Sequence, residues 1–358
     1  MDYEVRVRVG MLCLILPFLV VQILCIYREQ RLNILPTPDL DLQRLNMMFL
    51  SPETAAETLR PAAIDRPGNG SLRADEWRAL QAARQEFLAR SCRILAGRHG
   101  PLGAFLATKE FTRRLQHLLV DDEHRAIYCY VPKVACTNWK RIWMILTNKT
   151  SAESPDAIPS HVPHTTNVLR SLADSSYTAD DVRTRLSTYT KFLFVRHPME
   201  RLVSAFRNKF EKSSQFSKSI GPEILRKFRK SSGESSLNSN VTFSEFVSYV
   251  VDRKFRRREV LNEHWEAYTD LCLPCIVSYD YVGKYDTLKE DSDRILEEIG
   301  APDGLRFPAF VRSATASLVP RYLSTLPPSE LRFATDVYKM DFLLFQYQFP
   351  IFRNLTST

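Results

Sequence analysis

Two segments of the chain place a cation, a hydroxyl group and a helix start in an order that suits a phosphate or sulfate group. In residues 128–140, Lys133 and Thr137 lie in a loop between an apolar run and a helix-like run. Backbone N–H groups at a helix start point toward an anion, and the helix dipole favours negative charge there. The segment lacks the Gly-rich pattern of a nucleotide triphosphatase loop. An ordinary strand-to-helix connection with a solvated lysine is the competing interpretation.

The second segment, residues 192–210, repeats this arrangement with arginine. Arg196 follows an apolar run, and Ser204 lies two helical turns further on. Ligands bind at the carboxyl ends of strands in open α/β sheets. A guanidinium fork and a hydroxyl group there can form a second phosphate clamp. Three further cations of this segment are expected on a solvated helix face: Arg201, Arg207 and Lys209.

The surrounding pattern predicts the elements that position these loops. Three short apolar runs, residues 126–131, 191–195 and 276–282, are consistent with buried strands. Helices are expected at residues 139–146, from Pro198 onward and at residues 331–345. Two capping-box patterns predict two further helices: one begins after Thr242, which is followed by Glu245, and the other begins after Thr287, which is followed by Glu290, and ends at Gly300. Strands that alternate with helices predict an α/β domain with a parallel sheet. Upstream, residues 74–95 predict a helix that can dock on this domain.

Composition and the N-terminus narrow the location of the protein. The chain has 358 residues and a net charge of +8, which favours acidic partners. One apolar run, residues 10–27, predicts an uncleaved signal-anchor, with a cleaved signal peptide as the alternative. Residues 1–9 would then be a cytoplasmic tail, residues 28–110 a lumenal stem and residues 111–358 the catalytic domain. Glycosylation sequons support the lumenal side over a cytosolic one, and they begin at Asn69, Asn148, Asn240 and Asn354.

The cysteines are too sparse for a disulfide scaffold. Five of the seven follow the apolar run, and an odd number leaves a free thiol or an intermolecular bridge. Cys272 and Cys275 form a Cys-x-x-Cys pair that could be a zinc half-site, a redox pair or a disulfide. In an oxidising lumen, a disulfide between these two cysteines is favoured.

The two loop segments resemble the two PAPS-binding motifs of Golgi carbohydrate sulfotransferases, where PAPS is 3′-phosphoadenosine 5′-phosphosulfate. The resemblance is closest to the branch of chondroitin, dermatan and N-acetylgalactosamine 4-O-sulfotransferases and the HNK-1 sulfotransferase. It extends over roughly residues 115–350 and is carried by residues 128–141, 191–210, 262–265, 271–275, 279–285 and 338–342. It implies a sulfotransferase fold, with a P-loop-like parallel sheet flanked by helices, and a place in the Golgi. The resemblance is absent from the stem, so the N-terminal transmembrane helix, the stem and the type II membrane topology are expected from the apolar run and the sequons.

The resemblance also implies roles for individual residues. The 5′-phosphosulfate would be held by Pro132, Lys133, Val134, Ala135, Cys136, Thr137 and Asn138, with Lys133 as the catalytic cation. The 3′-phosphate would be held by Arg196, His197, Pro198, Met199, Glu200, Arg201, Leu202, Val203 and Ser204. His197 departs from the family, which usually has an acidic residue at that position. If His197 titrates near neutral pH, its protonated form would favour PAPS binding at mildly acidic pH.

Sulfuryl transfer relies on positioning and electrostatic stabilisation, and in principle it needs no metal. A base must take the proton of the acceptor hydroxyl. We predict His264 for this role, with Glu263 and His124 as alternatives. The resemblance implies a glycan acceptor, the 4-hydroxyl of N-acetylgalactosamine in chondroitin or dermatan. The basic run at residues 253–258 could steer such a polyanion, and nucleic acid is not expected as a partner. Two other hypotheses are a catalytically impaired glycan-binding relative and a nucleotide-dependent kinase.

Overall fold

A computed structural model describes residues 72–95, 114–165, 168–212, 214–229, 240–309 and 314–350. All of them belong to one compact unit, Arg66–Thr358. The predicted cytoplasmic tail, the apolar run at residues 10–27 and most of the predicted stem lie outside the described residues, as do Asn69 and Asn354. Within the described part of the chain, no helix is both long and apolar enough to cross a membrane.

The centre of the fold is a four-stranded sheet in the order β1-β2-β3-β4. Its strands are β1 (Leu118–Asp121), β2 (Ala126–Cys129), β3 (Thr190–Val195) and β4 (Tyr281–Lys284). β2, β3 and β4 are parallel, whereas β1 pairs with β2 in the antiparallel direction. The expected α/β class is therefore confirmed, and the expected parallel pairing holds for β2, β3 and β4 but not for β1. β1 was not expected from the sequence.

The third predicted strand, at residues 276–282, corresponds to β4 but begins later than predicted. Residues 276–280 lie outside β4, which begins at Tyr281, although the Asp280 N–H already donates to the Lys191 carbonyl of β3. Two disulfides, Cys129–Cys272 and Cys92–Cys275, connect the segment before β4 to β2 and to the helix that contains Cys92. The predicted Cys272–Cys275 disulfide was wrong, and so were the zinc and redox alternatives, because each cysteine has a distant partner. Cys136 is the free thiol among the described cysteines, and it is buried.

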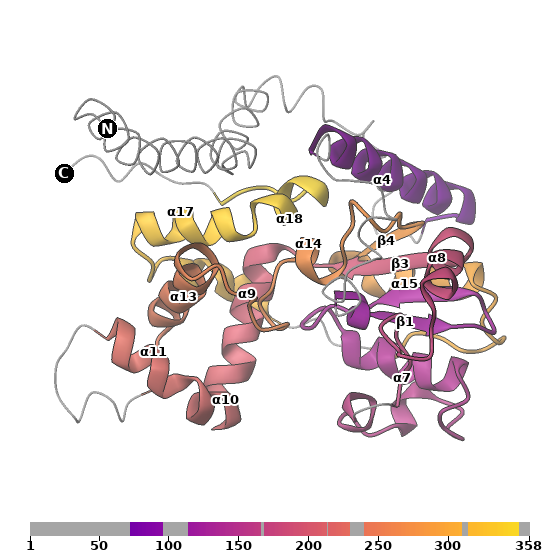
Figure 1. Ribbon diagram of the computed structural model, residues 1–358, viewed down its shortest axis with the longest axis horizontal. Helices are drawn as coiled ribbons and strands as arrows, with labels where there is room; N and C mark the ends of the chain where they lie inside the picture. The colour runs from indigo at the N-terminus through magenta and orange to yellow at the C-terminus, as the bar shows by residue number, and fades with distance from the viewer. Residues whose placement is uncertain are drawn as a thin grey trace, which may run out of the picture. The chain divides into compact units, whose positions relative to one another are not determined.

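Three helices beside the sheet match the sequence pattern closely, namely α7 (Cys136–Leu146), α15 (Leu288–Glu298) and the upstream α4 (Ala74–Leu95). A further helix, α8 (Ala179–Thr188), was not expected from the sequence. α4 has the bounds predicted from the sequence and packs beside β4 (Figure 1). The Arg84 guanidinium of α4 donates to the Val282 carbonyl of β4, and the disulfide of Cys92 fixes the other end of the helix. The docking of this helix on the domain is thus confirmed.

A second apolar core lies among helices that follow β3 in the chain. These are α9 (Pro198–Phe206), α10 (Ser214–Ser219), α11 (Gly221–Phe228), α13 (Phe243–Val251), α16 (Thr315–Leu323), α17 (Pro328–Val337) and α18 (Lys339–Leu344). The short α14 (Tyr268–Leu271) instead contributes Tyr268 and Leu271 to the core around the sheet. Phe206, Phe246 and Trp265 are among its buried aromatic residues. Two π-helical turns, Arg207–Glu211 and Asp252–Arg256, extend α9 and α13.

Two helix predictions need correction. The capping box at Thr242 and Glu245 forms, but the one at Thr287 and Glu290 does not. The Thr287 hydroxyl donates to Asp291 instead, and Glu290 accepts the backbone N–H of Leu72 at the start of α4. The single helix predicted at residues 331–345 is divided between α17 and α18 at Tyr338, whose buried hydroxyl donates to the Trp265 carbonyl.

Candidate functional site

The first loop turns sharply from β2 into α7. Lys133 and Ala135 adopt left-handed backbone conformations, with φ of 73° and 57°. Ala135 is the N-cap of α7, and no side chain caps the helix start. The N–H groups of Asn138 and Trp139 both turn back to the Ala135 carbonyl. The start of an 11-residue helix is therefore uncapped beside a lysine, which is an arrangement that accepts an anion.

Three lysines around this loop have no carboxylate within ion-pair distance among the described residues. Lys133 Nζ donates to Asn208 Oδ1 at 2.9 Å. Lys140 Nζ lies 3.6 Å from the centre of the Tyr130 ring, and Lys209 Nζ lies 4.6 Å from that of Phe216. Burial lowers the pKa of all three, that of Lys133 to about 8. Partly desolvated cations without counter-charges are the electrostatic signature of an anion site.

Arg196, at the end of β3, is buried and surrounded by protein partners. Its Nε lies 3.0 Å from Glu200 Oε2, and its terminal nitrogen donates to the Lys133 carbonyl at 3.3 Å. The guanidinium also lies 4.1 Å from the centre of the Tyr285 ring. Arg196 therefore joins the second motif to the backbone of the first loop. Ser204 is half-buried one turn beyond Glu200 on α9.

Arg201 is not on a solvated face, so that prediction was wrong. Its side chain is 2% exposed and donates to the carbonyl groups of Pro132, Glu263 and Glu266. A buried guanidinium with several fixed donors is well suited to join separate backbone segments. Arg201 thus connects α9 to the first loop and to the segment at residues 262–266. Arg207 and Lys209 are half-buried.

His197 is packed away from the loop cations. Its Nε2 lies 3.2 Å from the Gln348 carbonyl, and its ring contacts Phe342 and Tyr347 edge-on. Burial, the largest cause, lowers the pKa of His197 below its ordinary value of 6.5. Burial therefore disfavours the protonated ring, which weighs against a charge contribution to PAPS binding.

His264 lies beside the first loop with a defined tautomer. Its Nδ1 is 2.8 Å from Asn262 Oδ1, so Nδ1 carries the proton and donates, and Nε2 keeps its lone pair. Burial, followed by the charges of Lys209, Lys133 and Arg201, lowers the pKa of His264 to about 3. The predicted base is thus neutral, with Nε2 as its unprotonated nitrogen, but its protonated form is strongly disfavoured.

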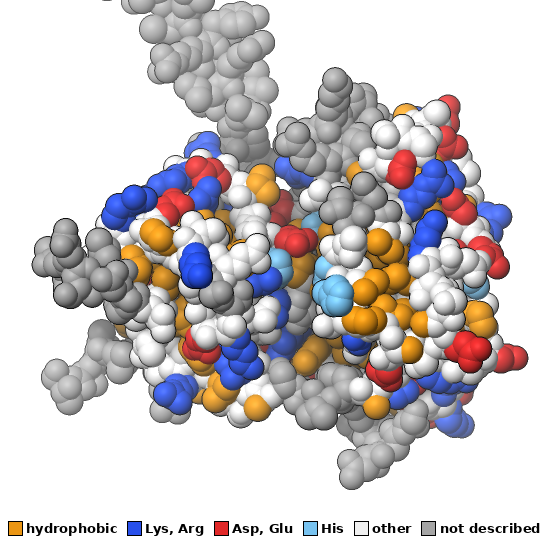
Figure 2. Space-filling view, turned by 90° about the horizontal axis from the view of Figure 1, so that it is seen from below, with side chains coloured by type: hydrophobic (Ala, Val, Ile, Leu, Met, Phe, Trp, Pro, Cys, Tyr) orange, Lys and Arg blue, Asp and Glu red, His pale blue; other side chains and the backbone are white. Residues whose placement is uncertain are grey.

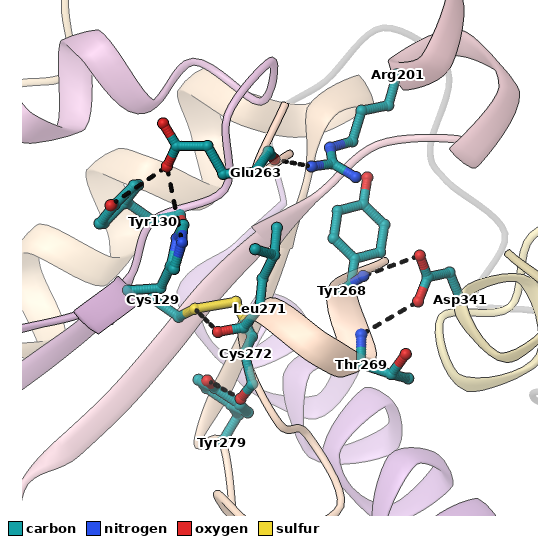
Figure 3. The surroundings of a disulfide bond; sticks show 11 residues. Cys129, Tyr130, Arg201, Glu263, Tyr268, Thr269, Leu271, Cys272, Tyr279 and Asp341 are labelled. Carbon is teal, nitrogen blue, oxygen red and sulfur yellow. Dashed lines mark hydrogen bonds and ion pairs between the residues drawn. A yellow bond between two sulfur atoms is a disulfide. The ribbon is translucent and has the colours of Figure 1, made fainter. Parts of the chain in front are cut away.

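The segment that carries His264 is held in place by contacts from three directions (Figure 3). The Arg201 guanidinium donates to the Glu263 carbonyl, and the backbone N–H groups of Tyr268 and Thr269 donate to Asp341. The disulfide of Cys272 with Cys129 fixes the far end to β2, immediately before the first loop. The loop and the His264 segment are therefore covalently and electrostatically fixed to each other.

Glu263 brings an acidic group to the same place. The Tyr130 hydroxyl donates a hydrogen bond to Glu263 Oε2 at 3.4 Å, and His117 Nε2 lies 3.7 Å from that oxygen. His117 was not anticipated from the sequence, because it precedes the short β1, which no pattern marked. His124, the other alternative base, precedes β2 and binds Asp121. It therefore lies at the opposite end of β2 from Lys133.

His164 is a further histidine that the sequence analysis missed. It ends the short 3-10 turn Val162–His164, and its Nε2 lies 2.9 Å from Thr137 Oγ1. The sequence offers one indication that His164 could lie at the site. The connection between the two motif segments is long enough for the chain to return to the first loop. Figure 2 shows histidine together with lysine or arginine side chains at a hollow in the described surface.

The basic run at residues 253–258 is largely neutralised by neighbouring carboxylates. Arg253 pairs with Glu223 and Glu259, while Lys254 pairs with Glu266 and Asp270. Arg256 is the most exposed of these cations, with its side chain 80% exposed, although it approaches Asp252. Glycan steering by this run is therefore weaker than its sequence suggested.

Two further expectations concern surface chemistry. Asn148 and Asn240 are exposed, so the described sequons are accessible for glycosylation, which remains a prediction. Among the described residues, no group of three or more His, Cys, Asp or Glu side chains is arranged to hold a metal ion.

Comparison with known proteins identifies the family. The profile described as "Sulfotransferase family" matches residues 116–348. Carbohydrate sulfotransferase 11 of Mus musculus is 42% identical over 247 residues, which cover 67% of this chain and 70% of that protein. Carbohydrate sulfotransferase 14 of Homo sapiens is 39% identical over 314 residues, which cover 86% of this chain and 81% of that protein.

Carbohydrate sulfotransferase 9 of Homo sapiens is 38% identical over 297 residues, which cover 79% of this chain and 64% of that protein. No solved structure matches the chain. The family match and the relatives agree with the resemblance of the two loop motifs, and they favour sulfuryl transfer over the kinase hypothesis. The chain belongs to the sulfotransferase family, and it is an enzyme of the carbohydrate sulfotransferase type.

Proposed function

We propose that this enzyme transfers the sulfuryl group of PAPS to the 4-hydroxyl of N-acetylgalactosamine in chondroitin or dermatan. The observation that carries the proposal is the set of Lys133, Lys140 and Lys209, which are partly desolvated and have no carboxylate partner among the described residues. Cations in this state gain most from an anionic ligand that replaces the lost hydration. PAPS supplies an activated sulfuryl group and a bisphosphorylated leaving group.

The first loop is the proposed 5′-phosphosulfate site. Lys133 neutralises charge that develops on the bridging oxygen, and the uncapped start of α7 offers backbone donors from Cys136 and Thr137. The remaining residues of this site are Pro132, Val134, Ala135 and Asn138. Because Arg196 holds the Lys133 carbonyl, the loop is preorganised before the donor arrives.

The second motif is the proposed 3′-phosphate site. Ser204 offers a half-buried hydroxyl, and Arg196 contributes positive charge while it remains paired with Glu200. His197, Pro198, Met199, Arg201, Leu202 and Val203 shape this site, chiefly by packing. Arg201 acts on the donor through the backbone of the first loop, because its guanidinium is occupied by carbonyl groups.

The acceptor side is the segment at residues 262–265. With Nδ1 fixed to Asn262, His264 presents a lone pair at Nε2 that can accept a hydrogen bond from a sugar hydroxyl. A base works best when its pKa lies near the operating pH, and that of His264 is about 3. His264 can therefore take the proton only if donor binding neutralises the lysines beside it.

We also propose the location inferred from the sequence. Residues 1–9 would be cytoplasmic, residues 10–27 the signal-anchor, residues 28–110 the stem and residues 111–358 the lumenal catalytic domain in the Golgi. The exposed Asn148 and Asn240 suit lumenal glycosylation. Treatment of the expressed protein with an endoglycosidase should increase its gel mobility, and an unchanged mobility would count against lumenal glycosylation.

The activity is tested with the full-length protein and labelled PAPS. The acceptors are desulfated chondroitin, desulfated dermatan and an oligosaccharide with terminal N-acetylgalactosamine, followed by disaccharide analysis of the sulfated position. We expect label at the 4-position of N-acetylgalactosamine. Binding of 3′,5′-adenosine bisphosphate without transfer to any acceptor would favour the catalytically impaired relative instead.

A further inference from the structure

His164 comes to the first loop from a part of the chain outside both motifs. The 3-10 turn that it ends packs against α7. Its Nε2 lies 2.9 Å from Thr137 Oγ1, and Thr137 belongs to the first turn of α7. The side chain of His164 is exposed, whereas that of His264 is only 19% exposed. His164 is therefore more accessible to solvent than His264.

The charges that face His164 come from three other elements. Lys140 lies on α7, Lys209 on the π-helical turn after α9, and Glu263 on the segment before α14; His264 is also within electrostatic range. Burial is the largest cause that lowers the pKa of His164, and Glu263 opposes the two lysines. His264, in contrast, meets Lys209, Lys133 and Arg201 with greater burial. The surroundings therefore disfavour the protonated form of His164 less than that of His264.

We propose that His164 is a catalytic residue, the base that takes the proton of the acceptor hydroxyl, with Thr137 holding its Nε2 until the donor binds. The inference rests on the proposed function. It gives His264 the role of hydrogen-bonding the acceptor sugar rather than that of the base.

The step balances as follows. The acceptor O–H bond breaks, and its proton moves to Nε2 of His164, which forms an imidazolium. The acceptor oxygen forms a new bond to sulfur, while the bond between sulfur and the bridging oxygen breaks. The electron pair of that bond leaves with the 5′-phosphate of the adenosine bisphosphate, where Lys133 stabilises the charge. Solvent then takes the proton from His164.

Thr137 connects donor binding to the availability of the base. In the Nδ1–H tautomer of His164, Nε2 accepts the hydrogen bond of the Thr137 hydroxyl. An anionic oxygen at the start of α7 is a stronger acceptor than an imidazole nitrogen. Once the Thr137 hydroxyl turns to the donor, Nε2 is released for the acceptor hydroxyl. The base is therefore engaged while the donor is absent, which limits unproductive proton transfer.

The test compares three variants of the full-length protein: His164→Ala, His264→Ala and the matched control His161→Ala. His161 is an exposed histidine at the start of the same 3-10 turn. Sulfate transfer from PAPS is measured as kcat across pH, and affinity for 3′,5′-adenosine bisphosphate is measured beside it. We expect His164→Ala to lower kcat by about 10²–10⁴-fold, the range for general base catalysis, with nearly unchanged nucleotide affinity. His161→Ala should behave as the wild type.

The pH profile and chemical rescue separate catalysis from structure. In the wild type, kcat should fall as pH falls through the pKa of the base, because the imidazole must be unprotonated to act. This acid limb should disappear in His164→Ala and remain in His264→Ala. Added imidazole should restore part of the lost kcat in His164→Ala, which a purely structural role would not predict.

Each alternative outcome overturns a different statement. Near-normal kcat in a folded His164→Ala protein overturns His164 as the base. An acid limb that disappears only in His264→Ala assigns the base to His264 instead. If the wild type transfers no sulfate to any acceptor, the proposed function fails, and the assignment of His164 fails with it. Measured melting temperatures confirm that the compared variants are folded.

Discussion

The two strand–loop–helix units look alike in sequence but use their cations differently. In the first unit, β2 to α7, Lys133 and Lys140 have no carboxylate partner among the described residues. In the second unit, β3 to α9, Arg196 pairs with Glu200, and Arg201 is enclosed by backbone carbonyls. The first unit keeps its charge available for a ligand, whereas the second uses its charge to hold the site together.

This difference follows from the chemistry of the two side chains. An ammonium is a compact charge on a flexible stem, whereas a guanidinium has five donors in a rigid fork. The fork can satisfy several carbonyl groups at once, as Arg201 does with Pro132, Glu263 and Glu266. A lysine in that position would leave some of these acceptors without a partner. Cations with similar positions in two motifs therefore need not have similar roles.

The largest expected effect on activity comes from removing the charge of Lys133, which has no carboxylate partner among the described residues. Lys133→Met should lower kcat/KM for PAPS by about 10³-fold, because it removes both a charged contact to the donor and stabilisation of the transition state. The melting temperature should stay the same or rise, since a partly desolvated cation is lost. Kinetics and thermal unfolding of one preparation check both parts. A large loss of stability would show that Lys133 also supports the fold.

Lys133→Met should also change how the stability of the protein depends on pH. Burial lowers the pKa of Lys133 from 10.5 to about 8, so between these values the unfolded chain binds more protons than the folded one. Stability conferred through Lys133 therefore rises as pH rises through this window. Lys133→Met should reduce that rise relative to the wild type, and identical slopes would contradict the lowered pKa.

The second effect should fall on stability. Arg201→Ala leaves three buried or half-buried carbonyls without their donor, which should cost about 3 kcal/mol. This corresponds to a fall in melting temperature of roughly 5–10 °C for a domain of this size. Thermal unfolding measures it, with Arg256→Ala as the exposed control on another helix. An unchanged melting temperature would mean that Arg201 acts on the ligand rather than on the fold.

A smaller effect is expected at the rim of the second motif. Ser204→Ala removes one neutral hydroxyl donor, which is worth about 0.5–1.5 kcal/mol, or roughly two- to tenfold in affinity. Isothermal titration with 3′,5′-adenosine bisphosphate measures this change. A loss as large as that in Lys133→Met would place the dominant phosphate contact in the second motif and reverse the comparison.

The smallest effect is expected at His197, the position where the family usually has an acidic residue. His197 is packed against Phe342 and Tyr347, and burial lowers its pKa below the ordinary value of 6.5, which disfavours its protonated form. His197→Gln should therefore leave the pH dependence of nucleotide binding unchanged between about pH 6 and 7.5, where an unperturbed histidine would titrate. Titration at several pH values tests this. Tighter wild-type binding at low pH that disappears in His197→Gln would restore the charge hypothesis.

Local patterns in the sequence determined much of this protein. The strand–loop–helix segments, the capping box at Thr242 and the helix Ala74–Leu95 depend on residues within a few positions of each other. Such short-range rules can be recognised without knowledge of the fold. The resemblance of the motifs then gave the family, which the comparisons support. The helix break at Tyr338 was not predicted; the Tyr338 hydroxyl donates there to the carbonyl of Trp265, 73 positions away.

Only the tertiary structure decided which groups meet at the site. Arg201 reaches the Pro132 carbonyl across 69 positions, and Cys129 meets Cys272 across 143. His164 returns to Thr137 from 27 positions away. The free energy of a charge depends on its burial and its partners, and both are properties of the folded chain rather than of any segment. The sequence could therefore name the cations, but only the fold determined which of them keep their charge available for a ligand.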